Sequence, residues 1–223
     1  MTLKSTETKT FYDRFGTKQD AQGFYEDPAL NDLIAHAHFE EAEHIFEFGC
    51  GTGRFVERLL KGYLPARAVY QGCDLSPTMV KLARERLSPY AERAQVSPST
   101  GPVKFDLPNH SVDRVISTYV LDLLSETDIG DFFNEAFRVL EVGGKLCLVS
   151  LTNGTTGISR FVTMIWKRIF QLHATLVGGC RPIRLEQFII PENWEIEYRG
   201  VVIAFGVPSE VVVARTKYTA RTV

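Results

Sequence analysis

The chain has 223 residues, of which 44% are hydrophobic and 23% charged, and its formal net charge is −2. This length and composition predict one soluble globular domain with a sizeable core. The small net charge and the lack of a basic block argue against nucleic-acid binding. The first ten residues are polar and contain no apolar signal core, so we expect a cytoplasmic protein.

Nothing in the sequence predicts a metal site. His36 and His38 lie two residues apart. On a helix their side chains would diverge by about 200° and could not face one site. We expect at least one of them to be a surface residue on a helical cover formed by residues 1–43. The four cysteines form no C-x-x-C pair and no metal-ligand spacing, which suits reduced thiols: Cys50, Cys73, Cys147 and Cys180.

Three glycines at every second position follow the apolar run at residues 44–48. They are Gly49, Gly51 and Gly53, and an amphipathic stretch at residues 55–60 comes next. Glycines are needed where a strand turns sharply into a helix and a ligand approaches the backbone. The sixth position counted from Gly49 is Arg54, so the G-x-G-x-x-G pattern of dinucleotide-binding folds is absent. Such a turn alone is also compatible with a purely structural elbow.

A second expected strand, residues 68–74, ends in Asp74. Ser76 is a suitable helix N-cap, and Pro77 suits the first helical position. In doubly wound folds an acid at the tip of the second strand binds the ribose hydroxyls of a nucleoside. Asp74 is the candidate for that contact; the alternative is a solvated turn residue.

Strands and helices continue to alternate through the middle of the chain. Apolar residues have helical spacing over residues 79–91 and 126–140, and we expect the second helix to stop at Gly143 and Gly144. This alternation predicts a parallel sheet with right-handed crossovers. The expected strands here are residues 94–97, 112–118 and 145–151.

The last two β-rich runs break the alternation. Residues 194–205 and 210–216 are joined by only four residues. A crossover helix does not fit in that length, so these strands should be antiparallel neighbours. Pure dinucleotide-binding domains lack such a terminal hairpin. The sequence therefore predicts a single α/β domain, residues 1–223, with a doubly wound, mostly parallel sheet ending in an antiparallel hairpin.

Residues 152–192 are expected to form an inserted helical cap. The apolar stretch 158–177 is interrupted by Arg160, Lys167 and Arg168, too often for it to span a bilayer. Apolar side chains occupy more than one helical face. Three interpretations stay open: a lid over a lipophilic or aromatic ligand, an interfacial helix at a membrane, or an ordinary helix packed on the sheet.

Four segments in this order resemble the motifs of class I S-adenosylmethionine (SAM) dependent methyltransferases. Residues 47–53 resemble the first motif, and Asp74 the second-strand acid. Residues 107–113 resemble the proline-containing loop and fourth strand, and residues 137–144 the R-V-L-x-P-G-G segment, with Val142 in place of proline. The nearest subgroup is the small-molecule enzymes of the ubiquinone/menaquinone-biosynthesis type. The resemblance implies a Rossmann-like, seven-stranded α/β/α sandwich.

The resemblance also implies SAM as cofactor and S-adenosylhomocysteine as product. Asp74 would bind the ribose, Leu75 and Met79 would pack on the adenine, and the glycine turn would approach the methionine portion. The family often has an acid after the third strand for the adenine amino group, but residues 97–102 contain none. The implied cofactor-binding residues are Glu47, Gly49, Cys50, Gly51, Gly53, Asp74, Leu75, Met79, Ser117, Thr118 and Tyr119, with Tyr12 and Phe15 from an N-terminal segment.

Methyl transfer needs alignment of donor and acceptor rather than a protein nucleophile. A general base is needed only for an acceptor that starts protonated. The candidates are His110, Tyr119 and Asp122, and none stands out. Tyr12 and Phe15 have an alternative interpretation as aromatics of a frayed terminus packed on the sheet edge.

The expected function is therefore methyl transfer from SAM to a small acceptor, which the apolar cap suggests is lipophilic or aromatic. A non-catalytic SAM-binding regulatory or partner protein is the alternative. A nicotinamide-dependent reductase is disfavoured by the glycine register and the terminal hairpin. The sequence does not reveal the acceptor, the atom methylated or the oligomeric state, and peripheral contact with a membrane is left open.

Overall fold

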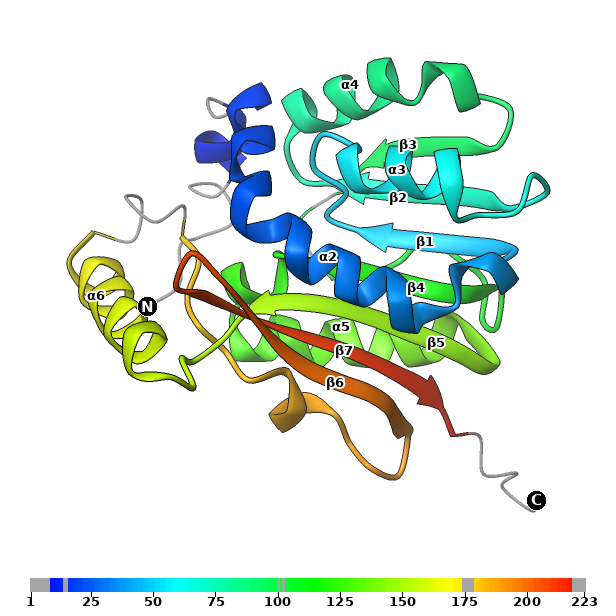
Figure 1. The fold of residues 1–223 in the computed structure, drawn as a ribbon. Coiled ribbons are helices and arrows are strands. Elements are labelled where there is room, and N and C mark those ends of the chain that lie inside the picture. Colours follow the sequence, from blue (N-terminus) through cyan, green and yellow to red (C-terminus); the bar gives the residue numbers. More distant parts are fainter. Residues whose placement is uncertain (1–8, 14–15, 100, 102, 174–178, 218–223) are drawn as a thin grey trace.

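The computed structural model describes residues 9–13, 16–99, 101, 103–173 and 179–217. A seven-stranded sheet has the order β3-β2-β1-β4-β5-β7-β6, with helices on both faces (Figure 1). Its first five strands are parallel, and β7 is antiparallel to both β5 and β6. This confirms the predicted fold. The strands are β1 (His44–Phe48), β2 (Val69–Asp74), β3 (Ala94–Pro98), β4 (Val112–Thr118), β5 (Leu140–Leu151), β6 (Trp194–Ala204) and β7 (Val207–Thr216).

Two apolar clusters fill the spaces between the sheet and its helices, because alternate residues of each strand point to opposite faces. Ile45 and Ile116 belong to the first cluster, whereas Phe46 and Val115 belong to the second. Helices α2 (Gly23–Ala37), α3 (Arg54–Gly62) and α4 (Pro77–Arg86) pack into the first cluster, and α5 (Glu126–Val139) packs into the second. Helix α6 (Gly157–His173) lies at the end of the sheet where β5 ends and β7 begins (Figure 1). The 3-10 turns are η1 (Gly16–Gln22), η2 (Phe39–Glu41), η3 (Ser88–Tyr90), η4 (Leu121–Leu123) and η6 (Leu185–Phe188).

The expected end of the helix at Gly143 and Gly144 is wrong. α5 ends at Val139, and β5 begins directly at Leu140, which pairs with Val112. The register then shifts before Arg114 pairs with Lys145. Gly143, with φ +79°, lies in this irregularity. The glycines therefore accommodate a distortion within the strand rather than a helix cap.

Two other boundaries differ from the sequence prediction. α4 ends at Arg86 rather than continuing to residue 91, and the turn η3 follows with Pro89 in its first positions. A proline disfavours helical conformation in the residue before it, here Ser88. The β6–β7 turn consists of Phe205 and Gly206, with φ of 50° and 81°. Two positive φ values are typical of the two-residue turns that match the twist of a hairpin.

The N-terminal cover contains η1 and α2, and α2 packs on β5, β6 and β7. The side chain of Tyr198 on β6 stacks on His36 at 3.5 Å between ring centroids and donates to Asp32 Oδ2 at 2.8 Å. The inserted segment 152–192 contains α6 and η6. Within the part of the chain that is described, no helix combines the length and apolarity needed to cross a bilayer.

Candidate functional site

The main pocket opens at the carboxyl ends of β1, β2 and β4, where open α/β sheets bind ligands. It contains Asp74, the glycine turn after β1 and the residues that follow β4, three segments far apart in the sequence. The pocket is lined by Lys9, Tyr12, Gln19, Phe48, Gly49, Gly51, Cys73, Asp74, Leu75, Ser76, Met79, Ser99, Gly101, Thr118, Tyr119, Val120, Leu123, Leu124, Ser125 and Asp128.

The glycine turn brings backbone to the floor of this pocket. The N–H groups of Gly49 and Cys50 both donate to the carbonyl of Cys73, at 2.8 and 3.0 Å, which ties the turn to the end of β2. Gly49 has φ +79°, and a Cβ there would lie 2.3 Å from Val120 Cγ2. A side chain at Gly49 is therefore excluded both by conformation and by space.

Replacing Gly49 with alanine should destabilise the fold by about 2–4 kcal/mol, the sum of left-handed strain and overpacking against Val120. We also expect a loss of at least tenfold in cofactor affinity, because the turn must shift. Chemical denaturation and calorimetric titration measure the two effects. Gly62→Ala is the matched control, because no atom lies within 4 Å of a Cβ built there. Equal behaviour of the two variants would contradict the packing argument.

Asp74 connects the glycine turn to the start of α4. Its Oδ2 accepts from Gly51 N and its Oδ1 from Ser76 N, both at 2.9 Å. Burial raises the pKa of this carboxyl, and the two N–H donors oppose that effect. An ionised carboxylate has about four acceptor positions, so two remain for a ligand. Leu75 and Met79 line the pocket on either side of the Ser76 N-cap, whose Oγ accepts from Met79 N at 3.2 Å.

An N-terminal helical segment, residues 9–13, borders the same pocket. Asp13 Oδ1 accepts from Ser76 Oγ at 2.5 Å, and Lys9 Nζ lies 3.1 Å from Asp13 Oδ2. Tyr12 lines the pocket, and its hydroxyl interacts with the thiol of Cys180. Burial, followed by the effect of Cys180, raises the pKa of Tyr12. The predicted partner Phe15 lies outside the described residues.

A smaller polar pocket adjoins the main one between α2 and the glycine turn, and Cys50, Gly51 and Tyr119 line it. Glu47 is 1% exposed, accepts from the hydroxyl of Tyr70 at 2.7 Å, and burial raises its pKa to about 7. Glu26 lies 3.2 Å from Arg54, and burial raises its pKa to about 7 although Arg54 opposes the shift. The pocket therefore contains two buried carboxyls beside one guanidinium.

Gln19, Glu26 and Arg54 were not identified from the sequence as site residues. Gln19 Oε1 is buried and, within the described part of the chain, has no hydrogen-bond partner. A Cβ on Gly51 would lie 2.8 Å from that oxygen, so the amide contacts the glycine turn closely. A buried acceptor without a partner is costly unless a ligand supplies a donor. Its sequence signal is weak, because Gln19 lies in a polar N-terminal stretch and reaches the site only through tertiary structure.

The residues at the end of β4 divide into two roles. Thr118 and Tyr119 line the main pocket. Ser117 is fully buried, and its Oγ donates to the carbonyl of Phe48 at 3.1 Å, so it joins β4 to β1. Tyr119 has φ +57°, unusual for a residue other than glycine, and its hydroxyl donates to Ser209 Oγ at 2.9 Å. Gly53 is the N-cap of α3, and a Cβ there would lie 3.3 Å from Ala83 of α4.

The three candidate bases are separated. His110 lies in the turn before β4, at the opposite edge of the sheet, and its Nδ1 bonds the carbonyl of Leu140 at 2.9 Å. Tyr119 is on the pocket wall, and burial raises its pKa. Asp122 on η4 is fully buried, its Oδ1 lacks a partner among the described residues, and burial raises its pKa to about 7.

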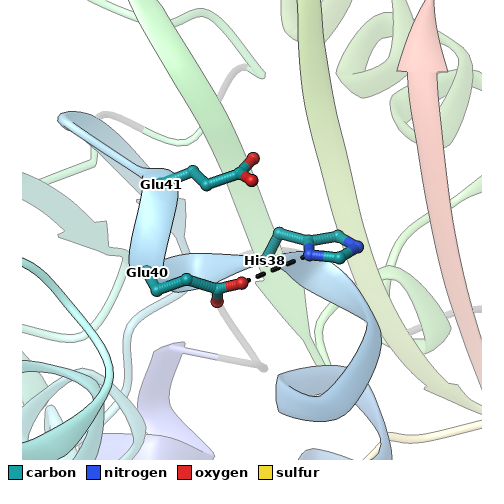
Figure 2. A group of neighbouring side chains, drawn as sticks. All are labelled: His38, Glu40 and Glu41. Atoms are coloured by element: carbon teal, nitrogen blue, oxygen red, sulfur yellow. Dashed lines mark hydrogen bonds and ion pairs between the residues drawn. The ribbon is translucent and has the colours of Figure 1, made fainter.

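His38, Glu40 and Glu41 gather at the end of α2 (Figure 2). Their ligand atoms all lie within 4.8 Å of one another, and all three residues are exposed. His38 Nδ1 lies 3.3 Å from Glu40 Oε1. The group precedes β1 and is therefore at the edge of the sheet opposite the pocket. His36 is stacked on Tyr198 and is not part of it.

The trio is an exposed ion-paired surface cluster and shares no residue with either pocket.

Helix α6 lies beside the site and not over it. Trp166 packs with Tyr25, Leu151 and Ala204, and its Nε1 donates to the carbonyl of Cys180 at 3.0 Å. Tyr119 packs against the same cluster. None of the described α6 residues lines the main pocket. Any effect of α6 on the site is therefore indirect, through the cluster of Tyr25, Leu151 and Ala204 against which Tyr119 also packs.

Comparison with protein families identifies a methyltransferase domain over residues 45–144. A carboxy-S-adenosyl-L-methionine synthase from Chromohalobacter salexigens is 28% identical over 132 residues, which cover 59% of this chain and 48% of that protein. An uncharacterized methyltransferase from Bacillus thuringiensis is 31% identical over 141 residues, covering 60% of this chain and 59% of that protein. The chain thus matches only about half to three fifths of the length of these relatives.

Solved structures share the fold at low sequence identity. The N-methyltransferase NodS from Bradyrhizobium japonicum, in complex with S-adenosyl-L-homocysteine, has a TM-score of 0.66 at 16% identity, covering 86% of this chain and 88% of that one. The [4+2]-cyclase SpnF has a TM-score of 0.66 at 15% identity, and the match covers 86% of this chain and 81% of that one. A Haloferax volcanii methyltransferase complexed with the Trm112 activator has a TM-score of 0.70 at 12% identity, covering 96% and 99%.

Proposed function

We propose that the chain is a class I SAM-dependent methyltransferase that transfers the methyl group of SAM to a small lipophilic or aromatic acceptor. The observation that carries the proposal is the joint placement of Asp74 and the glycine turn in one pocket. The ubiquinone/menaquinone type remains part of the proposal. The four free cysteines suit a cytoplasmic location.

The residues of both pockets fit the chemical groups of SAM. The two free acceptor positions of Asp74 suit the ribose hydroxyls, and Leu75 and Met79 offer apolar surface for the adenine. The amino-acid tail would occupy the smaller pocket. There the unpartnered oxygen of Gln19 and the carboxyl of Glu47 suit its ammonium group. Ser99 and Gly101 supply the adenine side with a hydroxyl and backbone in place of the acid that relatives carry.

When bound, SAM supplies a methyl group that is already activated for in-line displacement. The chain's own task is then alignment, which can lower a barrier by about 7–11 kcal/mol. Thr118 and Tyr119 line the wall at the end of β4, and the bond from Tyr119 to Ser209 fixes that ring. A base is needed only where the acceptor starts protonated. We assign that role to no residue, because Asp122, whose pKa burial raises to about 7, is fully buried and is not among the residues that line either pocket.

The character of the pocket wall supports a lipophilic or aromatic acceptor. Val120, Leu123 and Leu124 line it from η4 and its flanks, and Tyr12 lines the same pocket. Aromatic rings and aliphatic side chains favour apolar ligands with a few directing polar groups. Asp128 and Ser125, where α5 begins, supply polar groups at the same pocket.

Calorimetric titration with S-adenosylhomocysteine tests cofactor binding first. We expect a micromolar Kd for this ligand and no heat from NADH. Binding of NADH alone would overturn the proposal in favour of a reductase. Binding of neither would show that the two pockets do not form a cofactor site in this chain.

Cofactor binding alone does not distinguish a methyltransferase from a non-catalytic SAM-binding protein. Incubation with methyl-labelled SAM and a panel of phenols, quinols and amines separates the two functions. Label in a solvent-extractable product supports methyl transfer. Tight binding without transfer to any acceptor class would favour the regulatory alternative.

A further inference from the structure

Helix α6 buries two hydroxyl residues on its inward side, next to the half-buried Val162 and Trp166. Ser159 and Thr163 are 0% and 6% exposed and face the protein. The hydroxyl groups of both residues have hydrogen-bond partners. Thr163 Oγ1 donates to the carbonyl of Ser159 at 2.7 Å and accepts from Gly154 N at 3.1 Å. Ser159 Oγ accepts from Thr156 N at 2.9 Å. Helices of globular proteins usually bury their apolar stripe and expose the polar one. α6 departs from this pattern, because apolar side chains lie on its exposed side as well as on its inward side.

The outward side of α6 is an apolar stripe. Ile158, Phe161, Ile165 and Leu172 follow one another at intervals of three, four and seven residues, which places them on one helical face. Their exposed fractions are 75%, 59%, 42% and 76%. A stripe of this size on a surface helix indicates a contact with something apolar.

The stripe continues onto the β6–β7 turn and the start of α2. Phe205 at the tip of the hairpin is 78% exposed, and its ring lies 5.4 Å from that of Phe24, which is 57% exposed. A Cβ on Gly206 would lie 3.1 Å from Val162 and 3.8 Å from Ile158, so the turn touches α6. Figure 1 shows α6 and the tip of this hairpin together at one end of the molecule. We call Phe24, Ile158, Phe161, Ile165, Leu172 and Phe205 the outer apolar face.

The charged side chains of α6 have one sign, whereas the acids Glu26 and Asp27 follow Phe24 on α2. Arg160 and Arg168 are exposed on α6, and the sequence also has Lys167 there. From residue 142 to residue 185 the sequence contains no aspartate or glutamate, although the whole chain has a net charge of −2. Basic side chains beside an apolar helical face are the pattern of helices that lie in the headgroup region of a membrane.

We propose that the outer apolar face binds the surface of a bilayer that contains anionic lipids. The apolar side chains would enter the boundary between headgroups and acyl chains, and the arginines would contact lipid phosphates. The hydroxyl groups of α6 already have partners on the inward side, so burial of the outward side leaves none of them unsatisfied. The basic side chains of α6 favour a surface of anionic lipids over one of neutral lipids.

The face is connected to the main pocket through aromatic contacts. The ring of Phe24 lies 5.1 Å from that of Tyr25, and Tyr25 lies 5.9 Å from Tyr119 on the pocket wall. A lipophilic acceptor dissolved in the bilayer would therefore be close to the site. This connection rests on the proposed function, whereas membrane binding itself does not.

Flotation of the full chain with vesicles tests the proposal. One set of vesicles contains phosphatidylcholine with 30% phosphatidylglycerol, and the other contains phosphatidylcholine alone. We expect binding to the anionic vesicles, at least tenfold weaker binding to the neutral ones, and a decrease at high salt. The double variant Phe161→Ser/Phe205→Asn should bind vesicles at least tenfold more weakly than the unaltered chain. The variant Arg160→Gln/Arg168→Gln should show a similar loss of affinity, but only for the anionic vesicles. Asparagine tolerates the positive φ at position 205, so the turn is preserved.

Val142→Ser is the matched control, because Val142 is 76% exposed and lies on β5, outside the outer apolar face. It should bind vesicles like the unaltered chain. S-adenosylhomocysteine titration of every variant keeps the two proposals separate. Binding of S-adenosylhomocysteine without binding of vesicles would overturn membrane docking alone. Binding of vesicles without binding of S-adenosylhomocysteine would overturn the proposed function alone. A dimer that the Phe161→Ser/Phe205→Asn variant converts to monomer, without vesicle binding, would assign the face to a second copy of the chain.

Discussion

Replacing Asp74 with alanine is expected to weaken S-adenosylhomocysteine binding at least tenfold. The carboxylate would lose its charge-assisted hydrogen bonds to the ribose, each worth about 1.5–3 kcal/mol. It would also stop holding the N–H groups of Gly51 and Ser76, which lie 2.9 Å from its two oxygens. Calorimetric titration measures the affinity, and denaturant unfolding measures the structural cost separately.

A change of ligand separates the ribose contact of Asp74 from its hydrogen bonds to the N–H groups of Gly51 and Ser76. The 2′-deoxy analogue of S-adenosylhomocysteine should bind the unaltered chain more weakly than the parent compound. The Asp74→Ala variant should bind both ligands equally, because the residue that distinguishes them is gone. A difference that persists in the variant would assign the ribose hydroxyls to another residue.

Replacing Glu47 with glutamine is expected to stabilise the protein above pH 7 and to leave it unchanged near pH 4.5. Burial raises the pKa of Glu47 in the folded chain from its ordinary value of 4.5 to about 7. The folded state therefore binds a proton that the unfolded state has released between these values. The stability that this proton provides is complete below about pH 4.5 and is lost as the pH rises through 7.

This shift of the Glu47 pKa corresponds to about 3 kcal/mol in the free energy of unfolding. The neutral glutamine should recover that amount at pH 8. The hydroxyl of Tyr70, which donates to Glu47 at 2.7 Å, can donate equally to the amide oxygen. Urea unfolding at pH 5 and pH 8 measures the difference. Equal stability changes at both pH values would show that Glu47 is ionised in the folded protein throughout.

The same substitution should weaken cofactor binding, because the methionine ammonium would lose a carboxylate. A substitution that raises stability and lowers ligand affinity is typical of a functional residue whose natural side chain lies in an unfavourable environment.

The succession of strands and helices along the chain could be predicted because the sequence carries local signals for it. The glycine turn and the Ser76 cap each depend on residues adjacent in the chain, and so does the separation of the last two strands. The structure brings Asp74, Leu75, Met79, Thr118 and Tyr119 to one pocket, as the sequence indicated. Parallel strands end at the same edge of a sheet, so residues at strand ends are expected to converge.

The polar half of the site could not be predicted in this way. Gln19 and Glu26 come from η1 and α2, and they reach the glycine turn only because α2 packs on the sheet. No periodicity in the sequence encodes that docking. The side of α6 that faces the protein was equally hidden, because its apolar residues occupy more than one helical face. The extension of β5 to Leu140 depended on a partner strand at Val112.

The position of β7 determines when this chain can finish folding. β7 is the last of the described strands, yet it lies inside the sheet between β5 and β6, and Val211 to Ala214 have no exposed surface. A ribosome-bound chain that lacks residues 207–216 would leave one edge of β5 unpaired and both apolar clusters incomplete. The five parallel strands can form an incomplete sheet during synthesis, but closure of the core follows release of the final hairpin from the exit tunnel. Chaperone binding during translation should therefore target the open edge of β5 until that moment.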